Sequence, residues 1–114
     1  MRRIEGEQVL MRIFIGQTDR WERKPLYMAL LELFRAKGLA GATVLHAVSG
    51  FGATSVMHEF HLLRLSQDLP LVIEVVDTQQ HIDSTLGEVD RMMSGGLITL
   101  EKVRVIYYDR DTKA

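Results

Sequence analysis

The chain has 114 residues, of which 46% are hydrophobic and 25% are charged, a composition typical of one globular domain rather than a disordered or membrane-spanning chain. Fourteen Lys and Arg balance fifteen Asp and Glu, and the formal net charge of −1 argues against a nucleic-acid partner. The absence of cysteine excludes disulfides, thiolate metal sites and cysteine nucleophiles. No apolar run approaches the roughly 20 residues of a membrane span and no signal-peptide pattern opens the chain, so we expect a cytoplasmic protein.

The first half of the sequence predicts a strand, a helix and a second strand. Residues 1–7 are polar and predict a flexible N-terminus, after which the alternation over residues 9–15 predicts a strand. A helix is expected from Pro25 to Gly38, because proline suits a first helical turn and glycine a helix end. Residues 43–48 predict the second strand. The helix has one apolar stripe, formed by Leu26, Leu30, Leu33 and Phe34.

The second half repeats this pattern after a long connection over residues 49–66. Residues 71–76 predict a strand, and the last strand is expected over residues 97–108. The alternation of the last strand slips at Glu101–Lys102, which predicts a bulge there. Residues 109–114 are expected to be a flexible C-terminus. Between the two strands lies a helix that Asp77 or Thr78 can cap, with the apolar positions Ile82, Leu86 and Val89.

The element order is therefore β-α-β-β-α-β, within one domain over residues 8–108. This order predicts an α+β, ferredoxin-like fold, in which a four-stranded antiparallel sheet carries two helices on one face. The strands have apolar residues on both sides, including Leu10, Phe14, Val72 and Val76. A free sheet face this apolar is rare in monomers, so we expect other subunits to cover it. The alternative is that segment 49–66 folds over it.

Two glycine-containing segments are candidates for ligand binding. Gly50 and Gly52 open the long connection, and paired glycines let a backbone approach a ligand or turn tightly. Ser94, Gly95 and Gly96 follow the second helix, where successive backbone N–H groups of small residues can hold a phosphate. The structural alternative for the second segment is a helix C-cap followed by a turn.

Charged residues supply two further candidates. Lys102 and Arg104 lie on one side of the last strand, where they can pair with acidic neighbours or reach a phosphate. His58 and His61, with Glu59 between them, would share a face of a helix and could bind a divalent metal with a third ligand. No acid–base pair or nucleophile stands out, so we expect the protein not to be an enzyme.

Short motifs in a fixed order carry a family resemblance. They are Ile15-Gly16-Gln17-Thr18-Asp19-Arg20, Pro25-Leu26-Tyr27, Gly38-Leu39-Ala40-Gly41-Ala42-Thr43-Val44, Gly50-Phe51-Gly52, Met57-His58, Ser66-Gln67-Asp68-Leu69-Pro70, Glu74-Val75-Val76-Asp77 and Gly96-Leu97-Ile98-Thr99. Over about residues 8–108 the chain resembles an uncharacterised family of PII-like proteins, domain of unknown function 190. This resemblance implies the ferredoxin-like βαββαβ fold, assembled as a homotrimer whose sheets pack together at the centre.

The resemblance also implies a regulatory role in signal transduction with no required cofactor. Adenine nucleotides (AMP, ADP or ATP) would bind in clefts between subunits, with Ser94, Gly95 and Gly96 as the phosphate loop. Lys102 and Arg104 would reach in from the neighbouring subunit, and Gly50, Gly52 and His58 complete the predicted ligand-binding set. Segment 49–66 corresponds to the T-loop, which docks onto a target, and the implied partner is a membrane transporter or channel. The alternative is a metal-tolerance trimer of the same fold that uses His58 and His61.

Overall fold

Four strands form the sheet on which the rest of the molecule is built. A computed structural model describes residues 3–51, 58–59 and 69–109. In chain order the elements are β1 (Arg3–Gly16), β2 (Arg20–Trp21), β3 (Lys24–Pro25), α1 (Leu26–Ala36), β4 (Thr43–His46), β5 (Ser49–Gly50), β6 (His58–Glu59), β7 (Pro70–Asp77), α2 (Gln79–Met92) and β8 (Leu97–Asp109).

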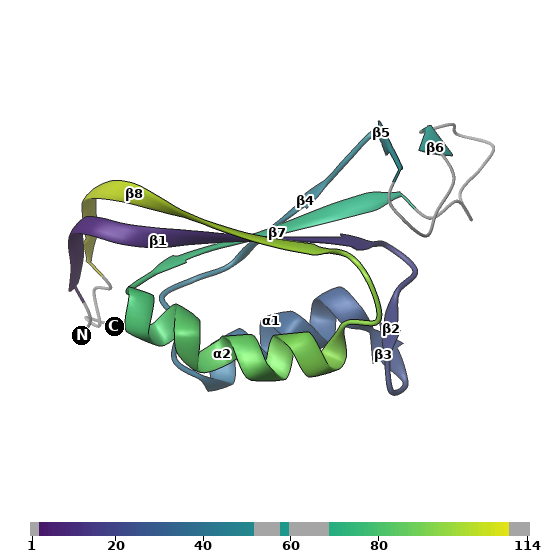
Figure 1. The fold of residues 1–114 in the computed structure, drawn as a ribbon, viewed down its shortest axis with the longest axis horizontal. Coiled ribbons are helices and arrows are strands. Elements are labelled where there is room, and N and C mark those ends of the chain that lie inside the picture. Colours follow the sequence, from purple (N-terminus) through teal and green to yellow (C-terminus); the bar gives the residue numbers. More distant parts are fainter. Residues whose placement is uncertain (1–2, 52–57, 60–68, 110–114) are drawn as a thin grey trace.

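The sheet has the order β4-β7-β1-β8, and every neighbouring pair of its strands is antiparallel. Both helices lie on one face of this sheet, and the other face carries no helix (Figure 1). This arrangement confirms the predicted α+β, ferredoxin-like fold. The short pairs β2–β3 and β5–β6 were not predicted, and they lie at the end of the sheet where β1 finishes. No helix among the described residues is long and apolar enough to cross a membrane.

The core lies between the sheet and the helices. Alternate β1 residues from Val9 to Ile15 face the helices, as do Ile73 and its alternate neighbours on β7. Burying each large aliphatic side chain contributes roughly 1.5–3 kcal/mol, so this layer holds the helices on the sheet. The helix residues that are fully or nearly fully buried are Leu26, Leu30 and Phe34 on α1 and Ile82 and Val89 on α2, as the predicted stripes require.

The start of α2 is fixed by two side chains. Thr78 is the N-cap, and its hydroxyl accepts a hydrogen bond from the His81 N–H at 3.1 Å. The fully buried Asp77 accepts from the Thr78 N–H and from the Ala40 N–H, each at 2.7 Å. Asp77 therefore ties the connection between α1 and β4 to the junction of β7 and α2.

The strand bounds correct two expectations. β1 begins at Arg3, so residues 3–7, expected to be flexible, are strand paired with β8. The irregularity of β8 is not at residues 101–102. The pairing is regular from Phe14–Leu97 to Gly6–Val105, and the shift falls between Gly6 and Ile4, which pairs with Tyr108. The apolar residues of β8 lie on one sheet face before residues 101–102 and on the other face after them, and Lys102 is exposed on the helix side. The alternation in the sequence therefore slips at this point although the strand pairing stays regular.

Candidate ligand-binding site

The turn between α2 and β8 holds the predicted phosphate loop. Ser94, Gly95 and Gly96 are all exposed. Gly96 has a φ of +112°, and a Cβ there would overlap the carbonyl oxygen of Phe14 and lie 2.9 Å from Met93 Cε. Only glycine fits this position without strain. The turn is therefore held against the end of β1 by backbone contact, which fixes where its N–H groups point.

Gly50 lies at the same end of the sheet as this turn. It belongs to β5 and pairs with His58 of β6. The free turn that was expected at Gly50 is therefore a short paired strand. A Cβ at Gly50 would lie 3.0 Å from Pro70 Cγ, so the backbone of β5 passes close to the start of β7. Figure 1 shows β5 and the α2–β8 turn at one end of the molecule. Gly52 lies outside the described residues.

Lys102 and Arg104 lie elsewhere on β8. Their register partners on β1 are Val9 and Glu7, and both cations are exposed. At about 3.3 Å per residue, Lys102 is roughly 20 Å along the strand from Gly96. They line an open hollow together with Gly6 and Glu7. One chain therefore does not bring the cations and the turn together.

The histidines show no metal centre within the described residues, where no group of three or more His, Asp or Glu could hold an ion. His58 pairs through its backbone with Gly50 in β6, and His61 lies outside the described residues. The metal alternative therefore stays a prediction. His81 contacts Thr78 at 2.8 Å instead of a ligand set.

Sequence reasoning missed a polar pair near the long connection. The imidazole Nε2 of His46 lies 3.1 Å from Gln17 Oε1, and both side chains are exposed. His46 ends β4 and Gln17 follows β1, and β7 lies between these two strands. The sheet order is the signal that could have found this pair, because it places the ends of β4 and β1 two strands apart.

An ion-pair cluster occupies the sheet face without helices. Arg12 Nε donates to Glu74 Oε2 at 2.8 Å, and Arg12 NH1 donates to Glu101 Oε1 at 2.7 Å. The hydrogen bond to Glu74, with a further contribution from Glu101, raises the pKa of the guanidinium above its ordinary value. Glu74 and Glu101 are therefore both paired with Arg12 within one chain, across β7, β1 and β8.

Known proteins resemble this chain in sequence. The model of the DUF190 family, described as "Uncharacterized ACR", matches residues 8–105. A UPF0166 protein of Aquifex aeolicus (strain VF5) is 42% identical over 98 residues, which cover 86% of this chain and 92% of the relative. A UPF0166 protein of Methanocaldococcus jannaschii is 30% identical over 97 residues, covering 84% of this chain and 89% of the relative.

Solved structures resemble it in fold. CPII, a nitrogen regulatory PII-like protein from Thiomonas intermedia K12 bound to ADP, AMP and bicarbonate, matches with a TM-score of 0.65 and 13% identity, covering 92% of this chain and 99% of CPII. A CPII structure bound to ADP and bicarbonate gives 0.58 and 16%, covering 91% of each chain. At these identities the similarity shows the fold alone. With a family match over residues 8–105 and a PII-like sheet and helix arrangement, this chain belongs to the DUF190 family.

Proposed function

We propose that this protein is a PII-like regulatory protein, and not an enzyme, that binds a small anionic ligand between the subunits of a homotrimer. The observation that carries the proposal is the fold it shares with CPII, whose two structures hold ADP together with bicarbonate. The proposed ligand class is an adenine nucleotide, AMP, ADP or ATP. The formal net charge of −1 means that an anion must be held by local groups and not by the charge of the whole protein.

The placement of the turn and the cations supports a site built by two copies. The residues of the turn at 94–96 are exposed, and successive backbone N–H groups of small residues suit a phosphate. Lys102 and Arg104 are exposed cations that suit the same charge, but they lie roughly 20 Å or more away on the same strand. A neighbouring copy that presents its β8 to this turn would complete the site.

Segment 49–66 is the proposed output of ligand binding. It starts in β5, at the end of the sheet that also carries the turn at 94–96 (Figure 1). We propose that a ligand held at this end changes the conformation of the segment and its contacts with a partner. We propose a membrane transporter or channel as the class of partner.

Titration calorimetry with AMP, ADP and ATP tests the ligand half. We expect a dissociation constant below about 1 mM for at least one nucleotide, and a loss of about tenfold or more in Lys102→Gln/Arg104→Gln. Arg35→Gln/Lys37→Gln is the matched control, since it removes two exposed cations from the C-terminal end of α1, which shares no residue with the proposed site. Absence of binding for all three nucleotides contradicts the proposal.

A mixing experiment tests whether two copies build the site. Gly95 lacks a positive φ, so Gly95→Asp is compatible with its backbone while its carboxylate repels a phosphate. We expect neither this variant nor Lys102→Gln/Arg104→Gln to bind nucleotide alone. Mixed assemblies refolded from both should regain part of the binding, because some sites then combine two unaltered contributions. No recovery in verified mixed assemblies contradicts a shared site.

A further inference from the structure

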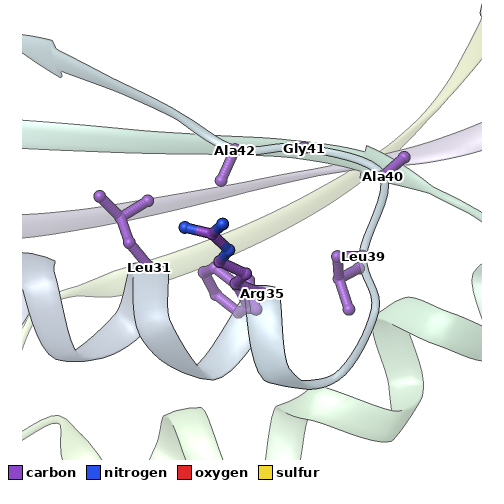
Figure 2. Close-up of a pocket in the computed structure, with 7 residues that line it drawn as sticks. Leu31, Arg35, Leu39, Ala40, Gly41 and Ala42 are labelled. Carbon is purple, nitrogen blue, oxygen red and sulfur yellow. The ribbon is translucent and has the colours of Figure 1, made fainter. Parts of the chain in front are cut away.

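An open hollow lies on the helix side of the sheet. None of the residues that line it belongs to the proposed nucleotide site or to the Arg12 cluster. Its cavity volume is about 430 Å³, within the range of small-molecule sites. One wall is the last part of α1, and the other is the backbone of residues 40–42 that leads into β4 (Figure 2). The Arg12 cluster lies on the opposite face of the sheet, so assembly through that face leaves the hollow accessible.

The floor of the hollow is apolar. Phe34 and Leu39 lie at its base and are almost fully buried, with exposed fractions of 1% and 7%. The half-buried side chains of Leu31 and Ala42 flank the opening. Figure 2 shows Leu31 and Leu39 on the two sides and Ala42 pointing toward the helix. Such a surface is suited to a small apolar group that displaces water.

The walls are held in place by hydrogen bonds. The Ala40 N–H donates to the buried Asp77 carboxylate at 2.7 Å. The Leu39 N–H donates to the Phe34 carbonyl at 3.0 Å, and Gly38 has a φ of +78° at the end of α1. Residues 38–40 are therefore fixed against both α1 and β7. A ligand does not have to order this wall on binding.

Arg35 adds a positive charge to this apolar hollow. Its side chain lines the hollow, and its guanidinium lies between Leu31 and Leu39 and is directed toward Ala42 (Figure 2). Nearby acids are engaged by other cations, since Glu32 pairs with Lys24 at 2.7 Å and Glu88 pairs with Lys37 at 2.6 Å. Within the described ranges no carboxylate pairs with Arg35. A guanidinium forms its strongest hydrogen bonds with a planar anion.

We propose that this hollow is a second ligand site that takes a small amphipathic anion. The carboxylate or sulfonate of the ligand pairs with Arg35, and its apolar body packs against Leu31, Phe34 and Leu39. The positive charge of Arg35 determines that the ligand has an anionic head group. The cavity volume limits the apolar body of the ligand to a short alkyl chain or a single aromatic system. The site does not depend on the proposed nucleotide site, because it uses none of the same residues.

Amide spectra of the full ¹⁵N-labelled chain test the proposal with three probes: octanoate, octan-1-ol and acetate. We expect octanoate to shift the amide signals of Arg35, Gly41 and Ala42, with at least about tenfold higher affinity than either other probe. Octan-1-ol has the chain without the charge, and acetate has the charge without the chain.

Two variants identify the residues responsible. Arg35→Gln should weaken octanoate binding about tenfold, whereas Arg91→Gln, which removes an exposed arginine from α2, should leave it unchanged. Ala42→Leu should fill the hollow and weaken octanoate and octan-1-ol alike, with thermal unfolding as the folding control. Equal affinity of the Arg35→Gln variant and the wild type overturns the proposal, as do shifts confined to other residues.

These experiments distinguish a failure of the second-site proposal from a failure of the proposed function. ADP binding measured by calorimetry, without octanoate shifts at Gly41 and Ala42, overturns this inference and leaves the proposed function standing. Octanoate binding without binding of any adenine nucleotide supports the inference and contradicts the proposed function.

Discussion

The conformation of Gly96 determines how the last strand leaves the second helix. Replacing it by alanine places a Cβ at a φ of +112° and against the Phe14 carbonyl oxygen. An unfavourable φ of this kind costs about 1–3 kcal/mol, and the overlap adds to it. We therefore expect Gly96→Ala to lower the free energy of unfolding by about 2–4 kcal/mol, measured by chemical denaturation.

A second glycine in the same region provides the control. Gly87 is exposed within α2, and a Cβ added there meets nothing within 4 Å. Gly87→Ala should raise the free energy of unfolding by about 0.5–1 kcal/mol, because alanine favours the helix. Equal stability of the Gly96→Ala variant and the wild type would show that the turn does not need this backbone conformation.

The Lys37–Glu88 pair predicts a pH dependence. Its hydrogen bond, with the Nζ and Oε1 atoms 2.6 Å apart, lowers the pKa of Glu88 below the ordinary value. The stabilisation is therefore fully present above the unfolded-state pKa of about 4.3, and it is lost as the pH falls through the folded-state pKa. The stability difference between wild type and Glu88→Gln should shrink over this window.

Carboxyl NMR titration measures the cause directly. In Lys37→Met the pKa of Glu88 should rise toward its ordinary value, because the hydrogen-bond donor is gone. Arg91 acts on Glu88 only through its charge, so Arg91→Gln should give a smaller rise. An unchanged Glu88 pKa in Lys37→Met would rule out this hydrogen bond in solution.

At the scale of the elements, Asp77 connects parts of the chain that are distant in sequence. Asp77→Ala leaves the N–H groups of Ala40 and Thr78 without their acceptor. We expect a loss of about 2–3 kcal/mol in the free energy of unfolding, since a donor left without its partner costs roughly 1–3 kcal/mol. Hydrogen exchange at the Ala40 amide should accelerate more than exchange in the middle of β1.

Asp77→Asn retains one acceptor oxygen and serves as the milder variant. It can still accept from one of the two N–H groups, so its loss should be smaller than that of Asp77→Ala. If exchange at Ala40 is unchanged in both variants, the connection between α1 and β4 is held by other contacts. That outcome would also remove a support of the hollow beside Arg35.

The elements that could be predicted are those with a repeated apolar pattern. The stripes on α1 and α2 and the alternation in β1 and β7 predicted the two helices, the sheet and its helix-covered face. The polar start of β1 escaped because Ile4 is the one buried residue in Arg3–Glu7, so this segment carries no alternation of apolar residues. Two-residue strands such as β5 are too short to carry a period.

Only part of each candidate site could likewise be predicted from the sequence. Small residues at 94–96 were enough to predict a turn between the second helix and the last strand. The contact that fixes the turn involves Phe14, more than 80 residues earlier, and only the sheet register reveals it. The hollow at Arg35 depends on the bond between Ala40 and Asp77, which are 37 positions apart. Local sequence patterns do not contain such pairs.

At the scale of the whole molecule, the sheet face without helices is mixed in character. Its apolar side chains include Leu45 and Leu97, which are 47% and 55% exposed. The Arg12 cluster lies among them, and its two carboxylates and one guanidinium are paired within the chain. If copies of the chain cover this face, as the proposed trimer requires, they bury charges that already have partners.

Removing the cation tests whether this face is an interface. Arg12→Met leaves Glu74 and Glu101 without a counter-charge, which is costly in a buried interface and nearly neutral on a free surface. We expect the dissociation constant of the assembly, measured by sedimentation, to rise about tenfold or more. Arg12→Met/Glu74→Leu/Glu101→Leu removes the carboxylates as well, and it should assemble at least as well as the wild type. An assembly indifferent to Arg12→Met would show that its subunits meet through another surface.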